Sequence, residues 1–275
     1  MLGDLSMRRN VTFAAALAVA LLTAGCGGGG GGATVAKAND GVGEPLAPVD
    51  AASKSNPGEL AARFLQDTTF RSLVVEVDYV EGRAPDAEAL DALVARLTSV
   101  CRKPQGATIV LDDAIPAGAF PDVLDAGSLE SLETTWRDRY ADAATGSAVL
   151  YVLCVPGAHE DDTPTARALG MAYGGTSVAL FLDATDRGHD VFATTAEMRA
   201  MILIHEACHV LGLVNNGLPM TAAHEDPHHA HHCDDATCLL AAAPTLPRLG
   251  PEIDDPAFSP LCRHCLEDLA ALADR

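Results

Sequence analysis

The sequence predicts an α/β fold, and two patterns with their order along the chain indicate it. Residues 73–80 form an apolar run that places alternate side chains on one face, as a β-strand does. Apolar residues at 90, 93, 94 and 97 recur instead at the spacing of a helix. Such segments follow one another as strand, helix, strand, helix, strand, strand, helix, an order typical of a sheet covered by helices.

The remaining elements follow from the same patterns. Asp86 is placed to cap the first helix, and a second strand is expected at residues 108–111. A second helix over 128–143 leads to strands at 148–155 and 177–182. Thr194 or Thr195 caps the last helix of this series, and Glu197 can complete a capping box with Thr194.

The first 25 residues have the features of an export signal. Arg8 and Arg9 precede an apolar run at 11–22, which is too short to span a membrane stably. The run ends at Leu22-Thr23-Ala24-Gly25-Cys26, which resembles a bacterial lipoprotein signal with Cys26 as the lipidated first residue. We therefore expect an exported, lipid-anchored bacterial membrane protein, periplasmic or at the cell surface, with plain secretion as the alternative.

Composition divides the rest of the chain. Residues 26–58 contain six consecutive glycines directly after Cys26, are rich in Gly, Ala and Pro, and predict a flexible tether. The folded domain is expected at 59–275, with the sheet and the motif helix in 59–212 and a loop-rich C-terminal subdomain in 213–275. That subdomain should end in a helix whose apolar face comprises Leu266, Leu269, Ala270 and Leu272 or Ala273.

Charge limits the partners of the protein. The chain of 275 residues has 18 Lys and Arg against 38 Asp and Glu, a formal net charge of −20. Because it has no basic stripe, nucleic acid and anionic lipid surfaces are not expected partners. The expected partner is a peptide or protein substrate, with membrane contact only through the N-terminal lipid; the sequence does not set an oligomeric state.

The motif His205-Glu206-x-x-His209 is the strongest functional signal. Two histidines four residues apart lie on one face of a helix, with Cβ atoms roughly 5–6 Å apart, so both imidazoles can reach one tetrahedral Zn²⁺. Glu206 is placed to take a proton from a water activated by the metal. Gly212 then ends the helix, because glycine readily adopts the left-handed conformation.

The residues from 205 to 265 also resemble a known family. H-E-x-x-H-x-x-G at 205–212 resembles the metzincin clan of zinc metallopeptidases, and a His-Cys pair at 232–233, a cysteine at 238 and C-x-x-C at 262–265 most resemble the archaemetzincins. The resemblance implies a metzincin-like fold with a twisted mixed sheet, His232 as the third zinc ligand and a second, structural zinc held by four cysteines. Asn215 stands where metzincins usually place the third histidine, and Leu240 stands in place of the expected methionine.

Several alternatives stay open at this point. His224 is the main competitor of His232 as third ligand, followed by His228, His229, His231 and Asn215. The spacings C-x₄-C and C-x₂-C suit either a zinc site or two disulfides formed by Cys233, Cys238, Cys262 and Cys265.

Three further cysteines need an assignment. Cys101 and Cys154 are expected either to pair as a disulfide or to be separate buried thiols. Cys208, inside the motif helix, is expected to be a small core residue rather than a ligand.

These observations predict a zinc-dependent endopeptidase or aminopeptidase acting outside the cytosol, with Glu206 as general base. The strand at 177–182 is expected to hold substrate by edge pairing, as the clan resemblance implies. The alternatives are a non-catalytic zinc-binding lipoprotein that stores metal in its His-rich loop, and a peptidase scaffold that has lost activity.

Overall fold

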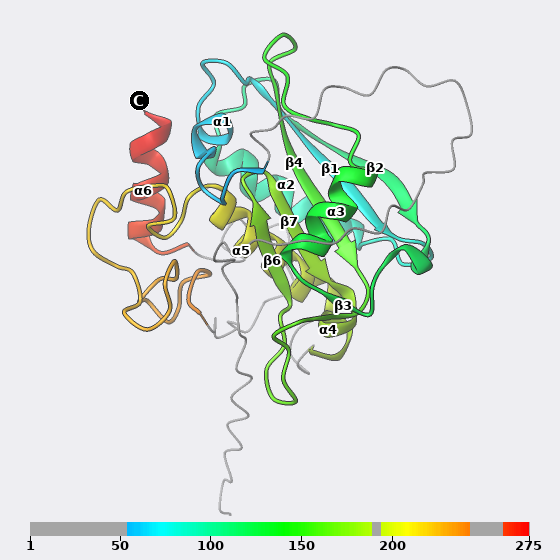
Figure 1. The fold of residues 1–275 in the computed structure, drawn as a ribbon. Helices are drawn as coiled ribbons and strands as arrows, with labels where there is room; N and C mark the ends of the chain where they lie inside the picture. Colours follow the sequence, from blue (N-terminus) through cyan, green and yellow to red (C-terminus); the bar gives the residue numbers. More distant parts are fainter. Residues whose placement is uncertain (1–53, 189–193, 243–260, 275) are drawn as a thin grey trace, which may run out of the picture.

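A twisted five-stranded sheet forms the centre of the computed structural model, which describes residues 54–188, 194–242 and 261–274 (Figure 1). Its strand order is β2-β1-β4-β7-β6. Four strands run parallel: β1 (Ser72–Val80), β2 (Ala107–Ile115), β4 (Ser147–Val155) and β7 (Ser177–Phe181). The edge strand β6 (Gly170–Gly174) runs antiparallel to β7. The sheet is therefore mixed, as predicted.

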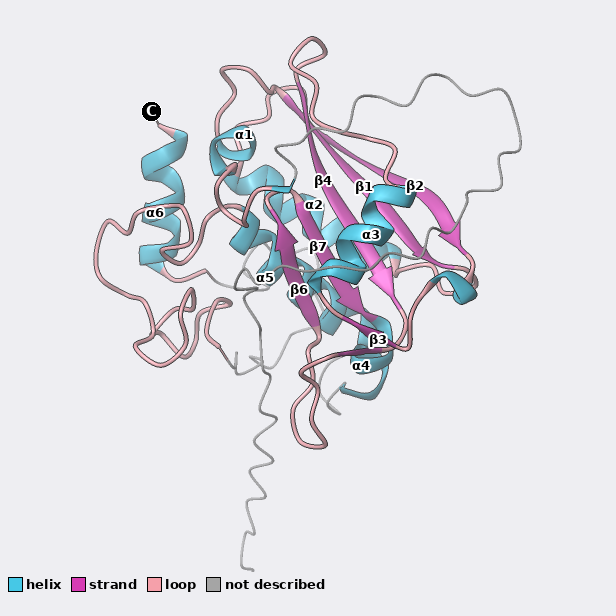
Figure 2. Cartoon of the chain, in the orientation of Figure 1, coloured by secondary structure: helices cyan, strands magenta, loops and turns pink. Residues whose placement is uncertain are grey.

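Helices cover both faces of this sheet. Figure 2 shows α3 (Ala126–Trp136) in front of the sheet and α2 (Ala87–Val100) and α5 (Thr195–Val210) behind it. The two rear helices pack against each other, and α5 also contacts β6 and β7. Two short strands, β3 (Val123–Leu124) and β5 (Ala158–His159), form a separate parallel pair.

The C-terminal part consists mostly of loops and ends in α6 (Arg263–Ala273), which packs against the short α1 (Ala61–Leu65). Its buried face differs from the predicted one. Leu269 and Ala273 are buried as expected, but Ala270 is exposed and Leu266 is 42% exposed, while Cys265 and Asp268 are buried. The helix is rotated because these two polar side chains face a cluster in the preceding loop.

The central strand β4 explains why the sheet is buried on both sides. Eight of its nine residues are buried, which matches the continuous apolar run of a parallel strand covered by helices on both faces. The sequence 128–143 was predicted to be one long helix, but α3 ends at Trp136. Beyond it, the N–H groups of Asp138 and Arg139 donate to the buried carboxylate of Glu76, which draws the chain away from a helical path.

Two further predictions are corrected. β7 is hydrogen-bonded to β4 on one side and to β6 on the other, so the predicted edge pairing of substrate at 177–182 is wrong. The edge strand β6 and the helix α4 (Leu182–Gly188) were not predicted. Asp86 does occupy the position before α2, but its carboxylate accepts from Arg199 of α5 and makes no capping hydrogen bond.

Within the described ranges, no helix is both long enough and apolar enough to cross a membrane. The predicted signal at 1–25 and most of the predicted tether at 26–58 lie outside the described residues.

Candidate metal centre

The motif helix α5 is fixed at both ends. The Thr194 side chain accepts from the N–H of Glu197, and the Glu197 carboxylate accepts from the N–H of Thr194, so the predicted capping box is formed. At the other end, Gly212 has φ +94°, and a Cβ atom there would lie 2.8 Å from Cβ of Leu218. Only glycine fits this turn without strain, and the turn directs the following loop back toward the helix.

The edge strand β6 lies unusually close to α5. A Cβ atom built on Gly170 would lie 2.5 Å from Cγ2 of Ile202 and 2.9 Å from Cγ of Glu206. The absence of a side chain at Gly170 therefore allows the strand to reach the helix at the motif. From the same strand, the N–H of Ala172 donates to Oε2 of Glu206 at 2.9 Å.

Three buried imidazoles lie close together near this turn. The ring centroids of His205 and His209 are 4.8 Å apart, and that of His232 lies 5.4 and 5.2 Å from them. The three residues each offer a ring nitrogen within 4.8 Å of the others. Nε2 of His205 and Nε2 of His209 are 3.1 Å apart, close to the separation of about 3.3 Å for two nitrogens on one tetrahedral zinc.

Backbone carbonyls fix the proton on each ring. Nδ1 of His205 lies 2.8 Å from the Leu239 carbonyl, and Nδ1 of His209 lies 2.8 Å from the Leu213 carbonyl. Nδ1 of His232 is 2.9 Å from the Ala230 carbonyl. A carbonyl oxygen only accepts, so each Nδ1 carries the hydrogen and each neutral ring has a lone pair on Nε2. Carbonyl-oriented imidazoles of this kind are typical of metal ligands.

The electrostatics also favour a cation between these rings. Burial lowers the pKa of His205 to about 4, and it lowers the pKa values of His209 and His232 as well. The rings are therefore neutral near pH 7, and the facing lone pairs of His205 and His209 repel each other unless a positive charge lies between them. Nε2 of His232 is buried with no hydrogen-bond partner. This donor set fits a zinc ion.

Glu206 has one carboxylate oxygen in use and one without a partner. Oε2 accepts from Ala172, while Oε1 is buried without a hydrogen-bond partner. Burial raises the pKa of this carboxyl to about 8. A buried carboxyl next to a candidate metal ligand, with one oxygen uncommitted, is suited to exchange a proton with a bound molecule.

The other candidate ligands lie elsewhere. His224 is buried, but it belongs to a separate group with cysteines. His228 and His229 are exposed, and Nδ1 of His231 lies 3.3 Å from the Val214 carbonyl. The amide of Asn215 donates to Glu225. Of the candidates raised by the sequence, the structure brings only His232 to the pair on α5.

A second cluster joins the loop after α5 to the start of α6. Sγ of Cys233 is 3.5 Å from Sγ of Cys262, and Sγ of Cys238 is 3.7 Å from Sγ of Cys265. Side-chain hydrogen bonds within the cluster lower the pKa of Cys238 and raise those of Cys233 and Cys265. The separations match two thiolates bound to one zinc, about 3.8 Å apart, and are far longer than a disulfide bond of about 2.0 Å.

The two candidate metal-binding groups are linked through the backbone. His232 and Cys233 are consecutive, and the N–H of Cys233 donates to the Leu240 carbonyl at 2.7 Å. The carbonyl of Leu239 orients His205. Leu240, which replaces the expected methionine, is fully buried directly after this carbonyl. The cysteine cluster therefore holds both the third histidine and a hydrogen-bond acceptor of the first.

Cys101, Cys154 and Cys208 are separate buried thiols. Burial raises the pKa of each to about 12, so none is a ready thiolate ligand. Cys26 lies outside the described residues.

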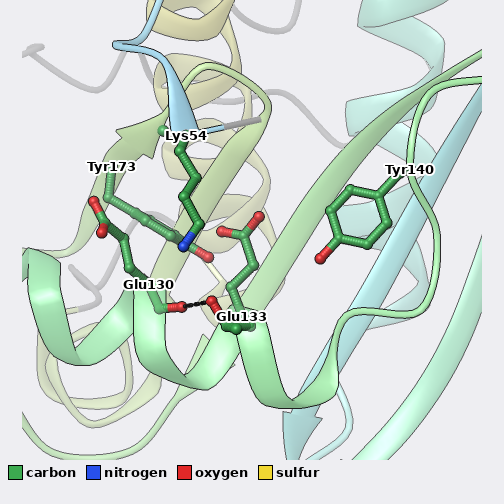
Figure 3. Close-up of a pocket in the computed structure, with 7 residues that line it drawn as sticks. Lys54, Glu130, Glu133, Tyr140 and Tyr173 are labelled. Atoms are coloured by element: carbon green, nitrogen blue, oxygen red, sulfur yellow. Dashed lines mark hydrogen bonds between the residues drawn. The ribbon is translucent and has the colours of Figure 1, made fainter. Parts of the chain in front are cut away.

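A hollow on the α3 side of the sheet involves none of these metal-site residues (Figure 3). Glu130 and Glu133 line it together with Tyr173. The charge of Glu133 is already balanced, because Nη1 of Arg137 donates to its carboxylate at 2.6 Å. Oγ of Ser177 donates to the same carboxylate at 2.9 Å. The hollow therefore has no free buried charge from Glu133 to offer a ligand.

Sequence reasoning did not find the supporting groups of the metal centre. Gly170 and Ala172 belong to a strand too short and too rich in glycine to show a period. The carbonyl acceptors of Ala230, Leu213 and Leu239 have no sequence signal because every residue has a carbonyl.

Comparison with known proteins gives a structural likeness only. No protein-family model and no curated protein matches the sequence. The structure is similar to archaemetzincin from Methanopyrus kandleri, at 15% identity and a TM-score of 0.46, over 76% of this chain and 98% of that one. It is also similar to a zinc-dependent peptidase from Methanocorpusculum labreanum, at 16% identity and a TM-score of 0.40, over 71% of this chain and 99% of that one. Both TM-scores are below 0.5, so the assignment of the site rests on the residues of this chain.

Proposed function

We propose that the protein is a zinc-dependent peptidase whose metal is held by His205, His209 and His232. The observation that carries the proposal is the convergence of three buried, carbonyl-oriented imidazoles on one point, with two bare nitrogens 3.1 Å apart. Three protein ligands leave the fourth position of a tetrahedral zinc open, which is the arrangement of a catalytic site rather than a structural one.

The residues of the chain then have distinct tasks. When bound, zinc would supply Lewis acidity, which would polarise a peptide carbonyl and lower the pKa of a water molecule. Glu206 accepts the proton of that water on its uncommitted oxygen and passes it to the departing amine. The hydrogen bond from Ala172 holds the other oxygen and so fixes the direction in which Glu206 points. Burial excludes bulk water from these groups.

The cysteine cluster is proposed to hold a second, structural metal ion. Supporting this are the separation of 3.5 Å between the sulfurs of Cys233 and Cys262 and the direct link from Cys233 to His232. Closed sites with four protein ligands are typical of structural zinc. In this account the second metal fixes the loop that carries the third histidine, so the catalytic site depends on it.

The remaining parts of the proposal concern the cellular location of the protein and its substrate. We propose that the chain is exported and lipid-anchored through Cys26 and acts on peptides or proteins outside the cytosol. The signal pattern ending at Cys26 supports export, and the net charge of −20 argues against nucleic acid as the partner. An endopeptidase and an aminopeptidase are both consistent with the metal site.

One experiment separates this function from metal storage and from an inactive scaffold. The zinc-loaded chain is incubated with a peptide library, its metal content is measured, and Glu206→Gln is treated in parallel. We expect two zinc ions per chain in both proteins and cleavage only by the wild type. More than two ions without cleavage would favour storage. Two ions with no cleavage by either protein would favour an inactive scaffold, and equal cleavage by both would refute the role of Glu206.

A further inference from the structure

His224 lies against the cysteine cluster, and its ring nitrogen is placed as a metal ligand would be. Nδ1 of His224 is 3.5 Å from Sγ of Cys233 and 4.0 Å from Sγ of Cys265. These three atoms and Sγ of Cys262 all lie within 4.8 Å of one another. For a tetrahedral zinc, bond lengths of about 2.0 Å to nitrogen and 2.3 Å to sulfur give an N···S separation of about 3.5 Å. The contact to Cys233 has this length.

The opposite nitrogen of the ring is held by a buried carboxylate. Nε2 of His224 is 2.8 Å from Oδ2 of Asp268, and both side chains are at most 2% exposed. The other oxygen of Asp268 accepts from the N–H and the hydroxyl of Thr221, at 2.6 and 2.7 Å. An ionised carboxylate only accepts, so the hydrogen of a neutral ring is on Nε2 and the lone pair of Nδ1 faces the sulfurs. Carboxylate–histidine pairs orient metal ligands in this way.

The cluster thus offers five donor atoms to a metal that takes four. Cys238 is the fifth, with its sulfur 3.7 Å from that of Cys265. Two backbone N–H groups, from Leu240 and Cys262, already donate to this sulfur at 3.4 and 3.3 Å. Cys238 therefore has hydrogen-bond partners outside the cluster, whereas among the described residues Nδ1 of His224 has only the neighbouring sulfurs as partners.

The net charge of the site also favours His224 over Cys238 as the fourth ligand. Four thiolates around Zn²⁺ leave a net charge of −2, and three thiolates with a neutral imidazole leave −1. The site is buried, and the carboxylate of Asp268 lies on the far side of the His224 ring. Burying the smaller charge beside that carboxylate costs less free energy.

We propose that the second metal is bound by His224, Cys233, Cys262 and Cys265, with Asp268 as the residue that positions His224. The proposal rests on the second metal of the proposed function and not on the catalytic one. It changes the role of His224 from a candidate catalytic ligand to a structural one. The contact between Asp268 and His224 also connects α6 to the loop after α5. Within that loop, the N–H of Asp234 donates to the His224 carbonyl.

The test uses the full chain loaded with ¹¹³Cd²⁺ alone in place of zinc and read by ¹H–¹¹³Cd correlation. We expect one cadmium signal to couple to ring protons of His224 and to β protons of Cys233, Cys262 and Cys265. A signal that couples to the β protons of Cys238 and not to His224 overturns the proposal. Because the catalytic position has no sulfur ligand, its cadmium gives a separate signal. Failure of the peptidase hypothesis therefore leaves this measurement readable.

Variants give an independent check in a chelator competition that measures zinc affinity. Asp268→Asn keeps the shape of the side chain, and loss of the carboxylate is expected to weaken the second site by about 10- to 100-fold. Cys238→Ala should retain the second metal, and His228→Ala, an exposed residue of the same loop, is the matched control with unchanged affinity. Loss of the metal in Cys238→Ala together with full retention in Asp268→Asn would overturn the proposal.

Discussion

Replacing Glu206 with glutamine should remove a pH-dependent cost of folding from the metal-free protein. Burial raises the pKa of this carboxyl from 4.5 to about 8. Between these two values the folded chain keeps a proton that the unfolded chain has released, so the free energy of unfolding falls as the pH rises. The slope is about 1.4 kcal/mol per pH unit, which amounts to about 3 kcal/mol at pH 7 and about 4 kcal/mol at pH 8.

Glutamine isolates this effect because it has nearly the same size and still offers an oxygen to the N–H of Ala172. The assay is urea unfolding, followed by circular dichroism, of both proteins from pH 5 to pH 8 in the presence of a chelator. We expect the stability of Glu206→Gln relative to wild type to rise steadily over this range. Glu130→Gln, which removes a carboxylate from an exposed position on α3, is the control for the loss of one surface charge.

Parallel pH profiles for wild type and Glu206→Gln would refute the reasoning, because they would mean that Glu206 ionises as freely in the folded chain as in the unfolded one. Added zinc provides a further check. A dication beside the carboxylate favours its charged form, so zinc should reduce the pH dependence that separates the two proteins.

The other predictions test the supports of the site. His232→Ala should lose one of two bound zinc ions in metal analysis, whereas His228→Ala should keep both; equal loss or equal retention would contradict the ligand assignment. Gly170→Ala introduces a methyl group 2.5 Å from Cγ2 of Ile202, and we expect a loss of about 1–3 kcal/mol in urea unfolding; an unchanged midpoint would show that strand and helix can separate freely. Thr194→Ala removes the capping box and should cost about 1 kcal/mol, while Thr194→Ser should restore most of it in the same assay.

The buried strands and helices were predictable because burial requires apolar residues at the spacing of a strand or a helix. β1, α2, β4 and α5 each have apolar runs or faces that the sheet and its covering helices require. The helix predicted at 128–143 is too long because a contact with a distant strand ends it early. Glu76, in a distant strand, accepts from the backbone after Trp136 and ends the helix there, and helical spacing along the chain contains no record of that contact.

The geometry of the candidate metal site was predictable for the residues on the helix and ambiguous for those in the loop. His205, Glu206 and His209 are related by the rise of one helix, so their geometry follows from spacing alone. His224 and His232 lie in one loop, and the backbone hydrogen bonds within that loop decide where each side chain points. One of these bonds runs from the N–H of Asp226 to the His232 carbonyl. That pairing turns one histidine toward α5 and the other toward the cysteines, and sequence distance does not distinguish the two.

Anomalous X-ray scattering at the zinc edge, from crystals of the zinc-loaded chain, tests the central claim most directly. The account predicts a zinc peak about 2.0–2.1 Å from Nε2 of each of His205, His209 and His232. It also predicts a second peak among the cysteines. A peak bound by the two histidines of α5 without His232, or no peak at these histidines at all, would contradict the account.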